Sequence, residues 1–220
     1  MTTTLITGAN KGLGFETARR LVAAGHTVYV GARFVQLDVT DDASVNAAAK
    51  TIEADGGLDV LINNAGMETR TEDNSVPVPS TVTADHMRTT FETNVFGVVR
   101  VLHAFLPLLE RSAAPVVVNV SSGLASLTYL SDPEHPAHFY PGVAYPTSKT
   151  ALNMLTVQFA KAFPKMRINS VEPGFTKTDL NGNTGTQTVE EGAEIIVRMA
   201  QTGPDGPTGG YFDVNGRLPW

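Results

Sequence analysis

Apolar residues follow two kinds of spacing along the chain. Short runs rich in β-branched residues predict strands, and longer segments with apolar residues three or four positions apart predict helices. The strands are expected at 4–7, 28–30, 35–37, 60–63, 116–120, 167–171 and 211–214, and the helices at 15–24, 44–53, 84–110, 144–163 and 189–201. Strands and helices that alternate in this way predict the α/β class, with a doubly wound, mostly parallel sheet and helices on both of its faces.

One junction in this pattern lacks a connection. Arg33 ends one expected strand and Phe34 begins the next, although neighbouring parallel strands need a crossover of about a dozen residues or more. Crossing a sheet means covering on the order of 15 Å, whereas one peptide unit spans about 3.8 Å. We therefore predict that a helix-containing segment of about 15 to 25 residues is missing between Arg33 and Phe34, either disordered or deleted. The alternative is one long bent strand over 28–39.

The length of 220 residues suits one α/β domain better than two. Pro- and Gly-rich stretches at 132–142 and 202–210 are too short to link domains, and the sequence has no internal repeat. We expect a single domain over residues 1–220.

Charge and composition narrow the classes of function. The formal net charge is −6 at pH 7 without a run of Lys or Arg, which opposes nucleic-acid binding, because phosphate backbones bind clustered positive charge. The sequence has no cysteine, and its five histidines do not show the HExxH spacing of a zinc site. We expect a small-molecule substrate and no metal. The N-terminus lacks the pattern of a signal peptide, and no apolar stretch approaches the roughly 18 residues of a membrane span, so we expect a cytoplasmic protein without membrane contact.

A glycine-rich loop follows the first expected strand and opens the first helix. Within the segment TGANKGLG at 7–14, the glycines allow a tight turn and close approach of a pyrophosphate to the positive helix N-terminus. The loop therefore predicts a Rossmann-type dinucleotide site, and the plainer interpretation is a turn whose glycines serve geometry alone. The loop residues expected to contact the cofactor are Gly8, Asn10, Lys11, Gly12, Leu13 and Gly14.

The residue at the end of the second strand indicates which cofactor is used. NAD sites usually place an acidic residue there to hold the ribose 2′-hydroxyl, whereas this chain has Arg33. A guanidinium can pair with a 2′-phosphate, and Lys11 adds a second cation. We predict NADP(H), with the alternative that Arg33 and Lys11 are ordinary solvated cations. Asp38, on the following strand, suits a hydrogen bond to the adenine amino group.

Several motifs now stand in a characteristic order. They are TGANKGLG at 7–14, Asp38-Val39, NNAG at 63–66, VNVSS at 118–122, YPTSK at 145–149, and Pro173-Gly174 with Thr176 and Thr178. Together they resemble the short-chain dehydrogenase/reductase family over essentially the whole chain. The lysine of the glycine loop and the segments 173–180 and 209–220 look like the carbonyl-reductase branch of that family.

The resemblance implies a catalytic tetrad and further cofactor contacts. Tyr145 matches the family's catalytic tyrosine, Lys149 the lysine four residues on, Ser122 the second serine of VNVSS, and Asn94 the asparagine of the segment FETNVFG. The remaining implied cofactor contacts are Asp38, Val39, Asn64, Ala65, Gly66, Pro173, Gly174 and Thr176. The single domain would thus be both dinucleotide-binding and catalytic.

These residue types suit the reduction of a carbonyl. A tyrosine has an ordinary pKa of about 10 and needs a nearby cation to act near neutral pH. Spacing of four on a helix puts Tyr145 and Lys149 on one face, so Lys149 is that cation. Ser122 would hold the substrate oxygen, and Asn94 would interrupt its helix and anchor a water that refills the proton.

The substrate side is less defined by sequence. The proline-broken segment 130–142, here called the flap, is expected to cover the site partly, and its His135 and His138 are expected to be surface residues rather than catalysts. The segment after Gly174 is short and polar, which predicts an open pocket. Lining by Met67, Leu124, Phe139, Tyr140 and Phe175 suggests a bulky ketone, aldehyde or quinone.

The sequence thus predicts an NADP(H)-dependent carbonyl reductase or alcohol dehydrogenase that is a monomer or homodimer. The alternative is a non-catalytic, NADP-binding redox-sensing regulator on the same fold, although such proteins usually lack the Tyr/Lys pair. If the segment at Arg33 and Phe34 is deleted, a folded but inactive protein is a third possibility.

Overall fold

One mixed sheet forms the centre of the computed structural model, which describes residues 1–31 and 35–220. In this part of the chain the strand order is β2–β1–β3–β4–β5–β6–β7. All neighbouring strands run parallel except β6 and β7, which are antiparallel. The strands are β1 (Thr3–Thr7), β2 (Thr27–Gly31), β3 (Val60–Asn63), β4 (Val116–Val120), β5 (Arg167–Val171), β6 (Tyr211–Asp213) and β7 (Gly216–Arg217). This is the doubly wound α/β fold that the alternation of elements predicts.

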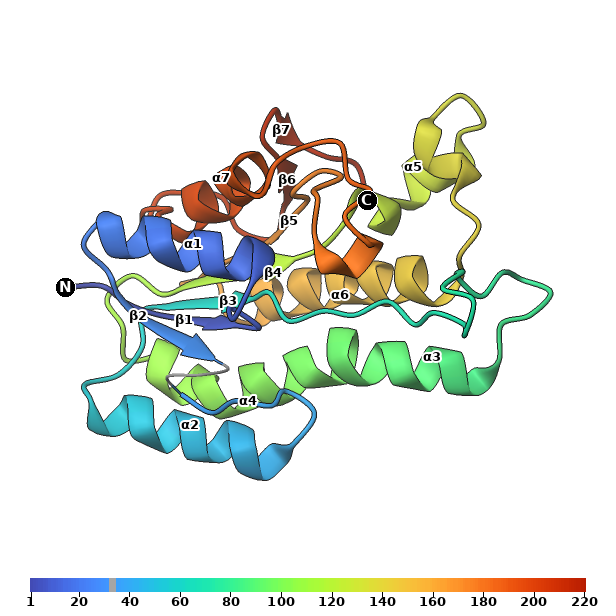
Figure 1. Cartoon of the computed structure of the whole chain (residues 1–220). Coiled ribbons are helices and arrows are strands. Elements are labelled where there is room, and N and C mark those ends of the chain that lie inside the picture. The colour runs from blue at the N-terminus through green and yellow to red at the C-terminus, as the bar shows by residue number, and fades with distance from the viewer. Residues whose placement is uncertain (32–34) are drawn as a thin grey trace.

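Helices cover both faces of the sheet (Figure 1). One face carries α1 (Gly12–Ala23) and α7 (Val189–Ala200), and the other carries α2 (Asp42–Ala54), α4 (Gly97–Leu109) and α6 (Ala144–Ala162). α3 (Ala84–Phe91) continues into α4 through a π-helical turn, η1 (Glu92–Phe96). The shorter elements are η2 (Gly123–Ala125), α5 (Leu127–Ser131), η3 (Pro136–Phe139) and η4 (Asp179–Asn181).

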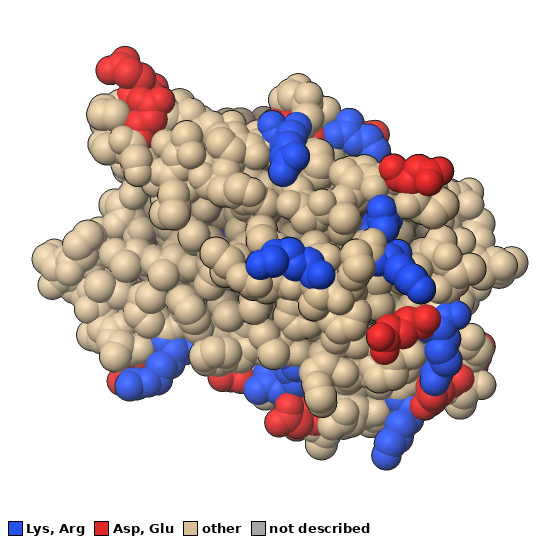
Figure 2. Space-filling view, turned by 180° about the vertical axis from the view of Figure 1, so that it is seen from behind, with Lys and Arg blue, Asp and Glu red and all other residues tan. Residues whose placement is uncertain are grey.

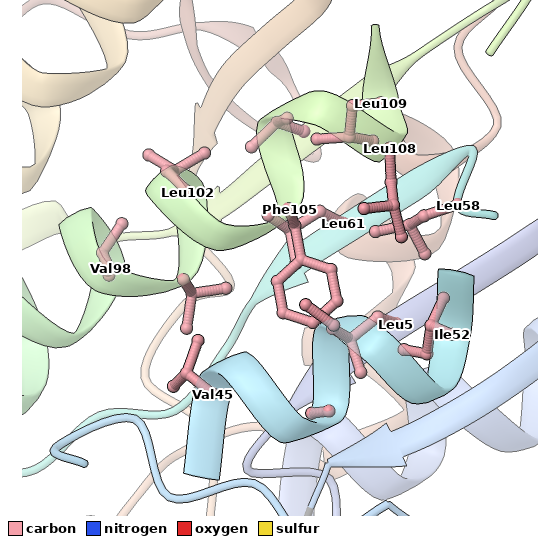
Figure 3. Close-up of a cluster of buried hydrophobic side chains, with 14 of the residues drawn as sticks. Leu5, Val45, Ile52, Leu58, Leu61, Val98, Leu102, Phe105, Leu108 and Leu109 are labelled. Atoms are coloured by element: carbon pink, nitrogen blue, oxygen red, sulfur yellow. The ribbon is translucent and has the colours of Figure 1, made fainter. Parts of the chain in front are cut away.

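The hydrophobic core has two layers because the central strands are buried on both faces. Every residue of β3 and β4 is buried, as parallel strands between two helix layers require. Phe105 of α4 projects between α2 and the sheet, toward Leu5 and Leu61 (Figure 3). The opposite layer packs α1 and α7 against Ile6, Ile62 and their neighbours. Both layers position the strand ends that carry the predicted site.

The strand expected at 35–37 does not form. Val35 makes only an isolated parallel bridge to Gly31, and Gln36 and Leu37 have no strand partner. The reason is the short connection, which cannot return the chain to the starting edge of the sheet. A continuous strand over 28–39 is not formed either, because β2 ends at Gly31 and residues 36–39 are not extended strand. Arg33 and Phe34 themselves lie outside the described residues.

The continuous helical run Ala84–Leu109 corrects a second expectation. It has 26 residues and is long and apolar enough to cross a membrane, judged by length and composition only, whereas the sequence was expected to have no such stretch. Its buried residues include Val98, Val101 and Leu102, which pack in the core. The apolar composition therefore follows from burial against the sheet and neighbouring helices.

Candidate active site

The glycine loop makes the close turn that a phosphate site needs. Gly8 and Gly12 have φ of 63° and 55°, in the left-handed region that favours glycine. A Cβ on Gly14 would lie 2.4 Å from Asn64 Nδ2, so only glycine fits there without a shift of its neighbours. Lys11 precedes α1, and no side chain of the described residues caps that helix N-terminus. The free N–H groups of its first turn fit an anionic pyrophosphate.

The NNAG segment braces this loop from the neighbouring strand end. Asn64 Nδ2 donates to the carbonyl oxygens of Thr7 and Gly8 at 2.8 and 3.2 Å. The backbone N–H groups of Asn64 and Ala65 both donate to Thr7 Oγ1 at 3.0 Å. These bonds join the carboxyl ends of β1 and β3, so the loop is held in one shape before any ligand binds.

A cavity of about 380 Å³ lies beside the loop at the edge of β2. It is lined by Gly8, Gly31, Gln36, Leu37, Asp38, Val39, Thr40, Ala65 and Thr93. One oxygen of Asp38 accepts hydrogen bonds from Thr40 N and Thr40 Oγ1, at 2.9 and 2.7 Å, and these bonds lower the pKa of Asp38. Four residues expected to touch the cofactor, Gly8, Asp38, Val39 and Ala65, therefore meet at one cavity. The place of Arg33 is outside the described residues.

Three of the four tetrad candidates meet at the carboxyl end of β4. Tyr145 and Lys149 lie on one face of α6, with Lys149 Nζ 5.7 Å from the centre of the Tyr145 ring. Lys149 Nζ donates to the Val120 carbonyl oxygen at 2.7 Å. Ser122 follows β4, and its hydroxyl lies close enough to the Tyr145 phenol to lower the pKa of that phenol. The arrangement brings a hydroxyl, a phenol and an ammonium together at the end of one buried strand.

Asn94 joins the same group from the π-helical turn. Its Nδ2 donates to Ser148 Oγ and to the Met67 carbonyl oxygen, both at 2.9 Å, and its Oδ1 accepts from Met67 N at 2.9 Å. A Cβ on Gly66 would lie 3.4 Å from Lys149 Nζ and 3.6 Å from Asn94 Oδ1. The helix widens into a π-helical turn at Asn94 without a break, and the Asn94 side chain holds the loop after β3 in place.

Burial acts on both titratable members of the group. Tyr145 is partly buried, and this burial raises its pKa, although the neighbouring Ser122 hydroxyl opposes the shift. The carboxylates Glu68 and Glu172 raise it further. Burial also lowers the pKa of Lys149 to about 8. Without cofactor, the phenol is therefore a neutral donor, and the ammonium is far easier to deprotonate than an exposed lysine.

The turn after β5 is held by its own hydrogen bonds. Gly174 has φ of 81°, and Gln187 Nε2 donates to the Pro173 carbonyl oxygen. Thr176 is 4% exposed, and its hydroxyl lies within hydrogen-bond distance of the Pro173 and Gly174 carbonyl oxygens at 3.3 and 3.2 Å. The Pro173, Gly174 and Thr176 group is thus a compact, internally bonded turn.

The substrate side holds polar groups that the motifs did not indicate. Tyr140 Oη donates to Glu68 Oε1. Phe139 and Phe175, which were expected to line the pocket, are 73% and 53% exposed. The buried Tyr211 donates to the Ser122 carbonyl oxygen. Burial raises the pKa of Glu172, which accepts backbone N–H bonds from Gly174 and Gly123. Glu68 and Tyr211 lie 72 and 89 residues from their partners, so no local pattern indicates these contacts.

Known proteins are similar to this chain over most of its length. A family model described as short chain dehydrogenase matches residues 30–189. Short-chain dehydrogenase anuI of Penicillium roqueforti is 38% identical over 228 residues, covering 90% of this chain and 88% of the relative. Salutaridine reductase of Papaver bracteatum is 31% identical over 291 residues, covering 96% and 94%. Both alignments are longer than 220 residues, so each includes residues of the relative without a counterpart here.

Solved structures agree with the sequence relatives. NADPH-bound carbonyl reductase from chicken fatty liver superposes with a TM-score of 0.83 at 27% identity, covering 100% of this chain and 99% of that chain. Salutaridine reductase from Papaver somniferum gives 0.82 at 28% identity, covering 96% and 99%. With the family model spanning most of the sequence, these comparisons show that the chain belongs to the short-chain dehydrogenase/reductase family of oxidoreductases.

Proposed function

We propose that the protein is an NADP(H)-dependent carbonyl reductase or alcohol dehydrogenase that acts on a ketone, aldehyde or quinone. The observation that carries this proposal is the convergence of Ser122, Tyr145 and Lys149 at the end of β4. Lys149 lies next to Gly66, and Asn64 of the same NNAG segment bonds to the glycine loop at Gly8 O. Each contact alone is common in proteins, but their combination suits proton transfer beside a bound dinucleotide.

The chain's own residues supply binding, orientation and a proton. Gly8, Gly12 and the first turn of α1 would hold the pyrophosphate, and the cavity at Asp38 and Val39 would take the adenosine. When bound, the nicotinamide supplies the hydride. Ser122 would donate a hydrogen bond to the substrate oxygen and hold it near the Tyr145 hydroxyl, which donates the proton.

Lys149 would assist Tyr145 by its charge. An ammonium close to a phenol favours the tyrosinate left after proton donation. Its carbonyl partner, Val120 O, fixes the head group at the strand end. Asn94, bonded to Met67 and Ser148, would keep the helix face and the loop after β3 in register. Water exchange with the lysine would refill the proton.

The preference for NADP(H) rests on two cations. Lys11 of the glycine loop is 64% exposed in its side chain and pairs with the exposed Asp179 at 2.7 Å, and Arg33 follows β2 in the sequence. The similar carbonyl reductase from chicken fatty liver was solved with NADPH bound. Arg33→Asp is expected to shift the preference toward NADH. Unchanged selectivity, measured as the ratio of kcat/KM for the two cofactors, would count against a role of Arg33.

A small-molecule carbonyl compound is the proposed substrate. Relatives include (+)-neomenthol dehydrogenase of Capsicum annuum, 30% identical, and salutaridine reductase. The names of these two relatives indicate small-molecule substrates, which supports a small-molecule substrate for this chain. The distribution of surface charge also suits a small-molecule substrate. On the face shown in Figure 2, Lys and Arg are scattered among Asp and Glu rather than gathered in one basic patch. A cytoplasmic location and a monomeric or dimeric state are proposed with it.

The first test is turnover of NADPH with a panel of ketones, aldehydes and quinones, with NADH in parallel. Turnover with NADPH is expected for wild type, and Tyr145→Phe should abolish it while nearly retaining NADPH affinity. Tyr29→Phe, on the distant β2, is the matched control. An active Tyr145→Phe variant would overturn the role of the phenol, and NADPH binding without any turnover would favour the redox-sensing regulator.

We also propose that residues 1–220 form one domain from which a crossover segment between Arg33 and Phe34 is missing. The absent strand at 35–37 and the relatives' longer alignments support this proposal. Mass spectrometry of the intact protein distinguishes a 23.4 kDa chain from a longer one. A 23.4 kDa protein that folds but binds no cofactor would favour a deletion that inactivates the site.

A further inference from the structure

A chain of polar contacts joins three segments around the substrate end of the site. Tyr140, in the flap at 130–142, donates a hydrogen bond to Glu68 Oε1. Arg70 Nη2 lies 2.5 Å from Glu68 Oε2 and donates at 3.4 Å to the carbonyl oxygen of Leu180. Arg70 Nη1 donates to Asn74 O at 3.0 Å. Glu68 therefore connects the flap to the loop after β3, and its partner Arg70 extends the contact to the segment after β5.

Burial makes this connection more than a surface contact. The side chain of Glu68 is 9% exposed and that of Arg70 is 28% exposed. A buried carboxylate needs partners for both oxygens, and Tyr140 and Arg70 supply them. Burial, and then the hydrogen bond to Glu68, raise the pKa of Tyr140. The phenol therefore remains a donor over the physiological pH range, and its bond to a charged acceptor is of the stronger kind.

Backbone contacts on both sides fix the hydrogen bond between Tyr140 and Glu68 relative to the tetrad. Met67, directly before Glu68, is bonded at both its N–H and its carbonyl oxygen to Asn94. At the other end, a Cβ on Gly142 would lie 2.7 Å from the Tyr140 ring, so the ring folds back against the glycine. Val143 N then donates to the Pro77 carbonyl oxygen at 3.4 Å. Tyr140 is thereby fixed five residues before Tyr145.

We propose that Glu68 is a positioning residue that holds the flap against the substrate end of the site through Tyr140. The flap position would determine how tightly bulky carbonyl substrates bind, without a direct part in the chemistry. The effect on substrates rests on the proposed reductase function, whereas the tie between Glu68 and Tyr140 does not.

Four variants test the tie. Tyr140→Phe removes only the donated hydrogen bond, Glu68→Ala removes the acceptor, and Glu68→Gln keeps an acceptor oxygen without the charge. Glu134→Gln, an exposed carboxylate of the same flap, is the matched control. Hydrogen exchange of the peptide 132–143, measured without cofactor or substrate, reports flap opening. Steady-state kinetics with a bulky and a small carbonyl substrate then separate KM from kcat.

Tyr140→Phe and Glu68→Ala are expected to accelerate flap exchange about ten- to a hundredfold, the range for a lost hydrogen bond to a charged group. KM for the bulky substrate should rise by a similar factor while kcat changes less than about twofold. Glu68→Gln, which keeps an acceptor without the charge, should change both properties less than Glu68→Ala does, and Glu134→Gln should match wild type. Flap exchange in Tyr140→Phe equal to that of wild type would overturn the tie, even if Glu68→Ala fails to fold. An inactive wild type would refute the proposed function and leave the exchange test intact.

Discussion

Lys11 and Asp179 form a salt bridge of 2.7 Å between the glycine loop and the turn after β5. Lys11 is the loop cation that the sequence assigns to the cofactor phosphate. In this structure its ammonium pairs with the carboxylate of Asp179. The hydrogen bond and charge of Lys11 lower the pKa of Asp179. Gly12 and Thr178 lie close beside the same contact. A 2′-phosphate would therefore compete with Asp179 for the ammonium.

Asp179→Asn is expected to tighten NADPH binding by about two- to fivefold, the small effect typical of an exposed ion pair. NADH binding should change little, because NADH lacks the 2′-phosphate. Both affinities can be measured by titration of the cofactor-free protein, and Asp205→Asn is a control in an exposed loop. Equal changes for the two cofactors would show that Lys11 does not contact the 2′-phosphate.

Gly14→Ala tests the fit of the glycine loop. A Cβ there would meet Asn64 Nδ2 at 2.4 Å and Ala9 Cα at 2.8 Å, so the brace from Asn64 to Thr7 must shift. We expect a loss of about 1–3 kcal/mol in the free energy of unfolding, the usual cost of overpacking, together with weaker cofactor binding. Gly203→Ala is the control, since a Cβ at Gly203 has no neighbour within 4 Å. Wild-type behaviour of Gly14→Ala would mean that the loop is not rigidly braced.

The sequence predicted those features of the fold that depend on neighbouring residues alone. Local periodicity predicts the strand before the glycine loop and the helix after it, and helical spacing puts Tyr145 and Lys149 on one face. The bounds of β3, β4 and β5 are those expected. The expected strand at 35–37 was wrong because its apolar pattern favours a strand, whereas the connection after Gly31, already too short in the sequence, leaves that strand no place in the sheet. The tie between Glu68 and Tyr140 could not be predicted, because tertiary packing alone brings residues 72 positions apart together.

Phe105→Ala tests the core layer that supports α4 and the sheet. Phe105 is fully buried, and removal of a buried aromatic ring usually costs about 3–5 kcal/mol. We expect a loss of that size in chemical denaturation. Phe15→Ala, at a side chain that is 56% exposed, should stay within about 0.5 kcal/mol of wild type. A small effect at Phe105 would mean that α4 repacks against the sheet.

Lys149→Met is expected to stabilise the cofactor-free protein while abolishing turnover. Burial lowers the pKa of Lys149 from 10.5 to about 8, so between these values the unfolded chain binds a proton that the folded chain does not. Wild-type stability therefore falls as pH decreases from about 10.5 to about 8 and stays lower below it. The cost is about 3 kcal/mol at pH 7, offset by roughly 1 kcal/mol for the bond to Val120 O.

The free energy of unfolding of Lys149→Met should thus exceed that of wild type by about 1–3 kcal/mol at pH 7. The difference should shrink as pH rises through the window from about 8 to about 10.5, because the unfolded wild type increasingly loses the proton that Lys149 must release on folding. Lys161→Met, at an exposed position of the same helix, is the control. A difference between Lys149→Met and wild type that is constant from pH 7 to 10 would mean that Lys149 is charged in the folded protein throughout, with its ammonium already available to Tyr145 before the cofactor binds.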